Sequence, residues 1–374
     1  MTVPQWIDTL DTPYLLIDEA ILKRNIAHLK NRVESLGSHL RPHLKTLRTL
    51  EAADYLLADK TRPATVSTLA EAEAYANAGY TDLLYAVGIA PAKLERVAQL
   101  RKHGINLHIL LDNMVQAKAV SDFARKHQQD FSVFIEIDSD DHRGGIKPEA
   151  PELIDIAQQL GRHFTGLMTH AGGSYGCNTA DALKAFAKRE CDAVRSAKSR
   201  LEASNIHCSI TSVGSTPTAH YGEDFSEITE VRAGVYTTFD LVMKNIGVCD
   251  FSDIAMSVVT TVIGYNKEKG WVLTDSGWMA LSRDRGTASQ SQDFGYGQVC
   301  KTDGSVLTGL CVNSTSQEHG VIELNDAYQL EDFPVGSQLR ILPNHACATA
   351  AMHPLYHILM SDGSHNTWQR IMGW

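Results

Sequence analysis

The sequence predicts an α/β protein in which a closed (β/α)8 barrel precedes a smaller all-β domain. Its 374 residues exceed what one ordinary hydrophobic core fills, which indicates two domains. From about residue 39 to 232, short β-rich runs alternate with longer helical patterns. After about residue 250, helical periodicity nearly disappears, and Gly, Asp and Asn turns separate short β-like runs. The alternation of β-rich and helical runs is typical of a barrel, and the turn-separated β-like runs are typical of an all-β domain.

Eight β-rich runs make up the barrel pattern, with helical patterns between them. The predicted strands are His39–His43, Ala64–Ser67, Asp82–Ala86, Asn106–Leu111, Phe131–Ile137, Phe164–Thr169, His207–Ser212 and Ile228–Arg232. The predicted helices include a segment from Thr46 onward, Leu69–Ala78, Pro91–His103, Asn113–His127 and Ala180–Ser204. Eight such strands favour a closed parallel barrel over an open doubly wound sheet. The open sheet remains the alternative, although no GxGxxG follows the first strand.

The β-like runs after about residue 250 predict an all-β domain. Its strands are expected at Met256–Tyr265, Trp271–Asp275, Gly309–Val312, Gly320–Leu324 and Gln338–Leu342, with a short helical tail near Leu355–Met360. We therefore assign residues 10–248 to the barrel and residues 249–374 to the β domain. Residues 1–15 form a segment that could pack with the β domain.

Charge and composition exclude several classes of protein. The net charge of -10, with no dense Lys/Arg stripe, argues against a nucleic-acid partner. No apolar run approaches the ~20 residues that span a bilayer, which argues against a membrane protein. Met1 to Trp6 lacks the basic and apolar regions of a signal peptide. The seven cysteines are scattered without a CxxC, which favours a reducing cytoplasm.

Lys45 is the most informative single residue. It lies in the run Arg41-Pro-His-Leu-Lys-Thr46, where the first predicted strand meets a helix. In a barrel, that junction lies on the face that carries the chemistry. A partly desolvated lysine amine there can form an imine with an aldehyde cofactor. Taken by position alone, a solvated surface lysine is the simpler interpretation.

Further polar residues follow other predicted strands and point to the same face. They are Ser67 and Thr68, Asp138 with Arg143, His170, Ser212 to Thr216, and Arg232 to Tyr236. In Val213-Gly-Ser-Thr-Pro-Thr218, a turn-forming glycine precedes hydroxyls at a helix start, a pattern that suits a phosphate monoester. A plain Ser/Thr helix cap fits the same residues. A second glycine, Gly234, follows the eighth strand, and loops seven and eight are where barrels often hold phosphate.

His345 and Cys347 form a candidate metal pair after the run Gln338–Leu342. If that strand continues, both side chains point to the same side, because side chains repeat every second residue. Imidazole and thiolate are good zinc ligands, and two protein ligands leave positions open for water or substrate. The alternative is a chance spacing with an inert cysteine.

Four motifs together identify a family. They are Arg41-Pro-His-Leu-Lys-Thr46, Val213-Gly-Ser-Thr-Pro-Thr218, Glu230-Val-Arg-Ala-Gly-Val-Tyr236 and Pro343-Asn-His-Ala-Cys-Ala-Thr349. The chain resembles the fold-type III pyridoxal-phosphate enzymes, in the branch of D-serine dehydratase, D-threo-3-hydroxyaspartate dehydratase and D-threonine aldolase. The likeness runs from about Leu10 to Trp374. It implies a TIM barrel of the alanine racemase type followed by a smaller all-β domain.

The resemblance also implies roles for individual residues. Lys45 would bear pyridoxal 5'-phosphate (PLP) as a Schiff base, with Arg143 near the ring oxygen of the cofactor and Tyr175 near its pyridine nitrogen. The positions that match the phosphate-binding residues are Ser215, Thr216, Gly234 and Val235. His345 and Cys347 match the metal pair of the family. A thiolate and an imidazole favour zinc, with Mn²⁺ and Co²⁺ as alternatives.

The expected activity is a PLP- and metal-dependent dehydratase. It would convert a D-3-hydroxy amino acid, such as D-serine or D-threo-3-hydroxyaspartate, to a 2-oxo acid and ammonia. Aldolases of the branch usually carry Asp where this chain has Cys347, so D-threonine aldolase ranks second. An amino acid racemase or a non-catalytic PLP-binding protein ranks third. The resemblance implies a homodimer, and Arg283 and Arg285 are candidates for binding a substrate 3-carboxylate.

Overall fold

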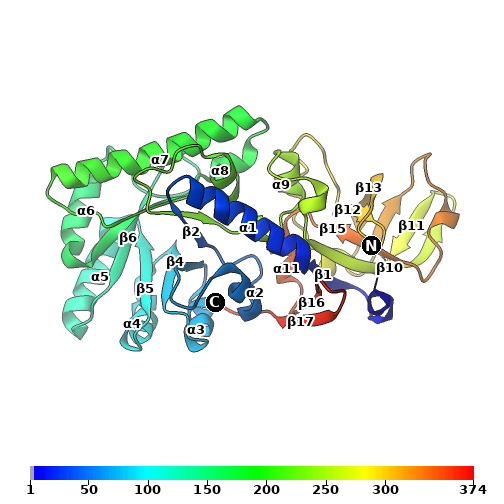
Figure 1. The fold of residues 1–374 in the computed structure, drawn as a ribbon, viewed down its shortest axis with the longest axis horizontal. Coiled ribbons are helices and arrows are strands. Elements are labelled where there is room, and N and C mark those ends of the chain that lie inside the picture. The colour runs from blue at the N-terminus through cyan, green and yellow to red at the C-terminus, as the bar shows by residue number, and fades with distance from the viewer. Residues whose placement is uncertain (1–3) are drawn as a thin grey trace. The chain divides into compact units, whose positions relative to one another are not determined.

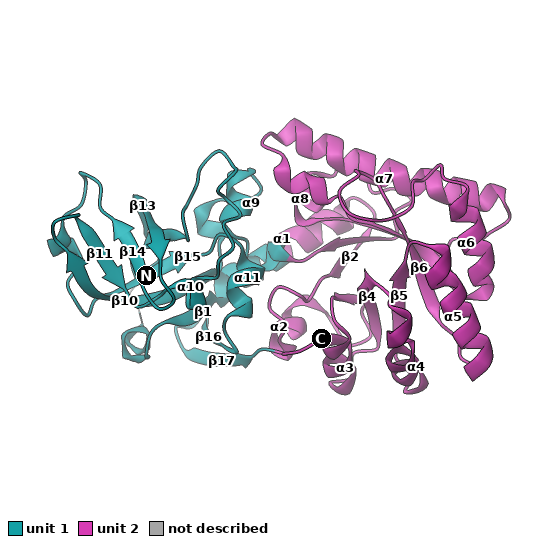
Figure 2. Ribbon diagram, turned by 180° about the vertical axis from the view of Figure 1, so that it is seen from behind, with its two compact units in different colours: residues 1–26, 235–370 teal, residues 27–234, 371–374 magenta. Residues whose placement is uncertain are grey.

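The computed structural model describes residues 4–374, which divide into two compact units. Unit 2 runs from Ala27 to Gly234 and includes Ile371–Trp374, whereas unit 1 combines the segment up to Ile26 with Val235–Arg370 (Figure 2). The boundary expected from the sequence lies later, near residue 248. The difference has a physical cause: the backbone N–H groups of Leu241 and Val242 donate to the carbonyls of Pro343 and Asn344 in unit 1.

The barrel of unit 2 contains eight parallel strands in the order β2-β9-β8-β7-β6-β5-β4-β3. The strands are β2 (His39–Pro42), β3 (Ala64–Val66), β4 (Asp82–Gly88), β5 (Asn106–Leu111), β6 (Ser132–Ile137), β7 (Phe164–Thr169), β8 (Ile210–Val213) and β9 (Glu230–Ala233). Each overlaps one of the eight predicted runs. A bridge between His43 and Thr65 joins the two ends of this order, so the sheet closes on itself.

Helices follow the strands and lie around the outside of the sheet, as Figure 1 shows for α3 to α7. They are α1 (Glu19–Ser35), α2 (Leu50–Leu56), α3 (Leu69–Asn77), α4 (Leu94–Lys102), α5 (Met114–His127), α6 (Glu152–Leu160), α7 (Ala180–Ala203) and α8 (Thr216–Tyr221). Most begin after a side chain that accepts a backbone N–H from the first turn. These N-caps are Thr49, Thr68, Asn113, Thr179 and Ser215. No described helix is long and apolar enough to cross a membrane.

The barrel interior is layered, with a polar layer near the start of the strands and an apolar layer above it. Leu84, Leu110 and Phe134 pack with Met168 in one buried cluster. Asp82, His108 and Ser132 lie two positions earlier on the same three strands, and therefore on the same face. His108 links the other two, with its Nδ1 2.6 Å from the Ser132 hydroxyl and its Nε2 3.6 Å from the Asp82 carboxylate.

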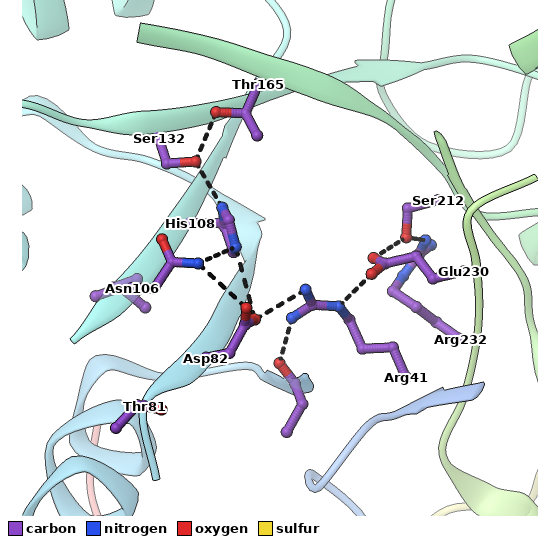
Figure 3. Close-up of polar contacts among 12 residues, drawn as sticks. Arg41, Thr81, Asp82, Asn106, His108, Ser132, Thr165, Ser212, Glu230 and Arg232 are labelled. Carbon is purple, nitrogen blue, oxygen red and sulfur yellow. Dashed lines mark hydrogen bonds and ion pairs between the residues drawn. The ribbon is translucent and has the colours of Figure 1, made fainter. Parts of the chain in front are cut away.

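Arg41 connects this polar layer across the line where the barrel closes (Figure 3). Its buried guanidinium lies 2.7 Å from Glu230 of β9 and 2.9 Å from Asp82 of β4, and donates to the carbonyl of Ala64 of β3 at 3.0 Å. Ser212 in turn donates to Glu230 at 2.6 Å. Arg41 therefore spans the strands on both sides of the closure.

Unit 1 is built on one sheet in the order β11-β14-β13-β12-β15-β10-β1-β16-β17. The strands are β1 (Tyr14–Asp18), β10 (Met256–Asn266), β11 (Trp271–Thr274), β12 (Gln298–Cys300), β13 (Val306–Thr315), β14 (Gly320–Glu323), β15 (Gln338–Leu342), β16 (Leu355–Leu359) and β17 (His365–Gln369). Short helices α9 (Leu241–Asn245), α10 (Trp278–Leu281) and α11 (Ala346–Ala351) connect them. The N-terminal strand β1 lies inside the sheet, where it pairs with β10 and β16.

Two expectations from the sequence are wrong. The expected helical tail near Leu355–Met360 is strand β16, because Tyr356 and Ile358 are buried and the strand pairs with both β1 and β17. The helix expected from Thr46 begins only at Leu50, because the side chain of Thr49 caps it. Lys45 therefore lies in a turn between the strand and the helix.

Replacing Arg41 with methionine should destabilise unit 2. The substitution leaves two carboxylates inside the barrel without their cation, and we expect the free energy of unfolding to fall by about 3–5 kcal/mol. Arg125→Met is the matched control, because Arg125 and its partner Asp122 are both exposed; its effect should stay within about 0.5 kcal/mol. Urea unfolding followed by far-ultraviolet circular dichroism compares the two. Equal shifts for both variants would contradict the role of Arg41.

Candidate active site

Lys45 lies in the turn after β2, at the end of the strand where barrel chemistry is found. Its backbone N–H donates to Nδ1 of His43 at 3.4 Å, and the next strand across, β9, ends beside it. A Cβ on Gly234 would lie 3.3 Å from the Cβ of His43, so a larger residue would crowd this turn. Glycine therefore allows the two strand ends to approach each other beside the lysine.

Two partly buried imidazoles next to Lys45 stay neutral. Burial lowers the pKa of His43 well below its ordinary value, and the charges of Lys45 and Arg232 lower it further. Burial and the Lys45 charge also lower the pKa of His170 to about 3, although a hydrogen bond with Gly214 opposes the change. Four side chains thus influence one another electrostatically: Lys45, His43, His170 and Arg232. Both histidines are neutral at neutral pH.

The tautomer of His170 follows from its hydrogen bond. Its Nδ1 lies 3.1 Å from the carbonyl oxygen of Gly214, which can only accept, so Nδ1 carries the proton. Nε2 is then the acceptor nitrogen. The ring of Tyr175, in the short 3-10 turn Gly172–Gly176, lies 6.3 Å from that of His170.

Arg232 brings a permanent positive charge to this neighbourhood. It is buried at the end of β9 and donates to the hydroxyl of Ser212 at 2.6 Å and to the carbonyl of Thr169. Burial lowers the pKa of Arg232 to about 10, although Glu230 and Glu190 oppose the change, so it remains charged. This arginine had no individual role among the sequence predictions, although it stands in the strand-end motif Glu230–Tyr236.

The loop after β8 places two hydroxyls with different roles. Ser215 caps α8: its side chain accepts the N–H of Thr218, and the Thr218 hydroxyl accepts the N–H of Ser215. The Ser215 hydroxyl also lies 2.9 Å from that of Ser174. By contrast, the buried Oγ1 of Thr216 has no hydrogen-bond partner within residues 4–374. An unpaired buried hydroxyl at a helix start is what a phosphate group would satisfy.

The two other positions expected near the cofactor lie at the same end of the barrel strands. Arg143 follows β6, donates to Glu136 at 3.1 Å and contributes to the low pKa of His170. Val235 follows Gly234 directly and is buried at the start of a 3-10 turn. The division into compact units assigns Val235 to unit 1.

His345 and Cys347 lie at the start of α11 and not in a continuing strand. His345 is the residue before the helix and Cys347 is its second residue. Asp240 fixes this turn, because its buried carboxylate accepts the N–H of Ala346 at 2.9 Å. The expected extended geometry is therefore wrong. The imidazole and the thiol nevertheless contact each other through a side-chain hydrogen bond.

Asp284 is the partner of the candidate metal pair that the sequence analysis missed. Its Oδ2 lies 2.6 Å from Nδ1 of His345. Burial acts to lower the pKa of His345, but the hydrogen bonds with Asp284 and Cys347 outweigh it and raise the pKa. The arginines that flank Asp284 have partners of their own: Arg283 stacks on Trp278 at 4.0 Å, and Arg285 pairs with Asp293 at 2.7 Å.

These residues fit the groups that the motifs suggest. The lysine, the unpaired Thr216 hydroxyl and the side-chain-free Gly234 suit an aldehyde cofactor with a phosphate. An imidazole in contact with a thiol, with an aspartate on its other nitrogen, suits a divalent metal. Within residues 4–374, no group of three or more His, Cys, Asp or Glu side chains is arranged around a common metal position.

Comparisons with known proteins agree with the two-part fold. A family model for the N-terminal domain of alanine racemase matches residues 17–241, and one for a serine dehydratase domain matches residues 255–359. D-threo-3-hydroxyaspartate dehydratase from Delftia sp. strain HT23 is 47% identical over 374 residues, which cover 98% of each chain. The chain belongs to this dehydratase family.

Other members of the family and its fold relatives extend the comparison. D-serine dehydratase from Dictyostelium discoideum is 31% identical over 95% of both chains. The crystal structure of an alanine racemase-like protein from Idiomarina loihiensis is 81% identical and superimposes with a TM-score of 0.99 over 100% of both chains. Alanine racemase from Clostridium difficile, at 13% identity and a TM-score of 0.68, shares the fold. The predicted fold class and the family resemblance are confirmed.

The low pKa of His170 predicts a pH dependence of stability. The unfolded chain takes up a proton near pH 6.5, whereas the folded site resists it until about pH 3. The free energy of unfolding should therefore fall as the pH drops from 6.5 towards 3, by up to ~1.4 kcal/mol per pH unit from this residue. His170→Asn, whose amide can keep the bond to Gly214, should lose less stability over that range.

Urea unfolding between pH 7 and pH 4 measures this difference. The control is His207→Asn, because His207 is exposed, and it should follow the wild-type curve. Parallel curves for the wild type and His170→Asn would show that His170 does not resist protonation.

Proposed function

We propose that the protein is a PLP- and metal-dependent lyase that eliminates water from a D-3-hydroxy amino acid, with D-threo-3-hydroxyaspartate as the first substrate to test. The products would be a 2-oxo acid and ammonia. The pair His345 and Cys347 carries the proposal. Solved structures of D-threo-3-hydroxyaspartate dehydratase, 46% identical to this chain, include a histidine-to-alanine mutant and a metal-free cysteine-to-alanine mutant. Their two substituted residues are two positions apart, as His345 and Cys347 are.

Residues of the barrel would hold the cofactor. Lys45 would bind PLP through its amine, with Arg143 and Tyr175 beside the ring. The phosphate group would be held by Ser215, Thr216, Gly234 and Val235. When bound, PLP supplies an electron sink for a carbanion at Cα, and a divalent metal, zinc first among the candidates, supplies a Lewis acid for the poor hydroxide leaving group.

The chain's own groups would then control protons and orientation. The Lys45 amine is the base proposed to take the Cα proton of the substrate. Neutral His43 and His170 flank it without adding positive charge, so the cations that act on these histidines are Lys45, Arg232 and Arg143. Asp284 holds Nδ1 of His345, which leaves Nε2 as the nitrogen for a metal and fixes the direction of the ring.

Carbon–carbon cleavage by an aldolase is the competing activity, because it could use the same lysine and metal pair. The 3-hydroxy-D-aspartate aldolase of Paracoccus denitrificans is 25% identical to this chain, compared with 47% for the dehydratase. The greater likeness to the dehydratase, together with Cys347, favours elimination. We also propose a homodimer, as the family resemblance implies, and a cytoplasmic location, which the lack of disulfide bonds among the cysteines of residues 4–374 favours.

Lys45 should be the residue that binds the cofactor. Borohydride reduction of the purified protein followed by peptide mass spectrometry should place the label on Lys45. Lys45→Ala should lower kcat by a factor on the order of 10³ or more, because it removes both the cofactor link and the base. Lys118→Ala, an exposed lysine of α5, is the control and should keep full activity. A label on a different lysine would refute the assignment.

Removing the metal should stop elimination and leave PLP bound. With D-threo-3-hydroxyaspartate as substrate, a chelator should abolish 2-oxo acid and ammonia while the imine absorbance persists, and zinc or manganese should restore both products. Asp284→Asn should weaken metal binding by roughly 10- to 100-fold, because it alters the group that orients His345. Asp326→Asn is the exposed control in the same unit.

The products decide between the two activities. Glycine and an aldehyde or glyoxylate as main products would establish an aldolase and end the dehydratase proposal. Full elimination activity in the chelated protein would remove the metal from the mechanism.

A further inference from the structure

Glu190 is a buried acidic residue to which neither the motifs nor the proposed mechanism gives a role. It lies on α7, beside α8 in unit 2 (Figure 2), and its exposed fraction is 1%. One oxygen of its carboxyl group, Oε1, accepts two backbone N–H groups, from Ala171 and from Gly214, each at 2.9 Å. A helix on the outside of the barrel thus reaches two loops at the catalytic end of the strands.

The two loops that Glu190 joins carry residues of the proposed cofactor site. Ala171 follows His170 in the loop after β7 and precedes Tyr175, whereas Gly214 precedes Ser215 and Thr216 in the loop after β8. Two further contacts join the same loops. The hydroxyls of Ser174 and Ser215 lie 2.9 Å apart, and Nδ1 of His170 donates to the carbonyl of Gly214.

The conformation of Gly214 makes its contact with Glu190 important for the segment Gly214 to Thr216 after β8, which we call the phosphate loop. Its φ of +125° lies in the region that favours glycine, and a Cβ would lie 2.3 Å from the carbonyl oxygen of Arg232. The loop is therefore pressed against β9, with the Gly214 N–H directed to Glu190. Without that acceptor, the Gly214 N–H would be buried and unpaired. A shift of the loop that gave this N–H another partner would then lower the free energy of the protein.

We propose that Glu190 is the positioning residue for the phosphate loop: through Gly214 it sets Ser215 and Thr216 to receive a phosphate monoester. This inference rests on the proposed function, since PLP is the phosphate-bearing ligand. Both N–H groups share one oxygen, so the contact requires an acceptor and not a negative charge. An amide oxygen at the same place would serve, with the amide NH₂ towards Thr218, which the carboxyl group already contacts.

The test compares the affinity of the protein for two forms of the cofactor that differ only in the phosphate. Wild type, Glu190→Ala and Glu190→Gln are purified with bound PLP, resolved, and titrated with PLP and with phosphate-free pyridoxal, using the imine absorbance as the readout. Glu202→Ala, an exposed glutamate on the same helix, is the matched control. Glu190→Asp, which withdraws the carboxylate by one methylene, replaces the alanine variant if that variant does not fold.

The expected result is selective. Glu190→Ala should weaken PLP binding about tenfold or more and pyridoxal binding less than about twofold, whereas Glu190→Gln should stay within about threefold of wild type for both. Equal losses for PLP and pyridoxal would mean a general effect on stability and would overturn the proposal, as would unchanged PLP affinity in Glu190→Ala. A wild-type protein that binds neither form would overturn the proposed function itself.

Discussion

The ion pairs of Arg41 are the interaction on which the barrel most depends. Backbone pairing between β2 and β3 is limited to the bridge at His43 and Thr65, so the closure has little main-chain support. The Arg41 guanidinium supplies contacts to both sides, to Glu230 of β9 and to Asp82 and Ala64 of β4 and β3. Arg41 and Glu230 are buried and Asp82 is partly exposed, and a buried cation is stable only while its anionic partners are present. Lys45 lies four residues after Arg41, in the turn that follows this closure.

The closure strands also differ from the rest of the barrel in what they carry towards the catalytic end. On β4, β5 and β6, the polar layer is followed by leucine and phenylalanine, which seal the interior. On β2 and β9 the next residues on the same face are His43 and Arg232. A chain of contacts therefore continues from Arg41 through Glu230 and Ser212 to Arg232 (Figure 3). The apolar cluster fills the interior beside β4 to β7. On the opposite side, β2 and β9 bring His43 and the positive charge of Arg232 close to Lys45.

Buried carboxyl groups shape the loops in both units by the same physical means. Glu190 accepts the N–H groups of two barrel loops, and Asp240 accepts those of Met243 and Ala346 beside the candidate metal pair. Glu71 accepts the N–H of Ser67 after β3 in the same way. A carboxylate that pairs otherwise unsatisfied N–H groups holds a loop without needing regular secondary structure. The irregular segments near Lys45 and His345 thus have defined conformations.

The sequence by itself determined the features that depend on neighbouring residues. Strand and helix periodicity placed all eight barrel strands, and the motifs located Lys45, the Ser215 cap and the pair His345 and Cys347, because each of these signals lies within a few residues. Only the tertiary structure decided the rest. Glu190 reaches Gly214 from 24 positions away, Asp284 reaches His345 from 61, and β16 is a strand because β1, far away in the chain, pairs with it. Local patterns do not encode such partners, because hydrogen bonds and buried charges are satisfied by whichever groups the folded chain brings together.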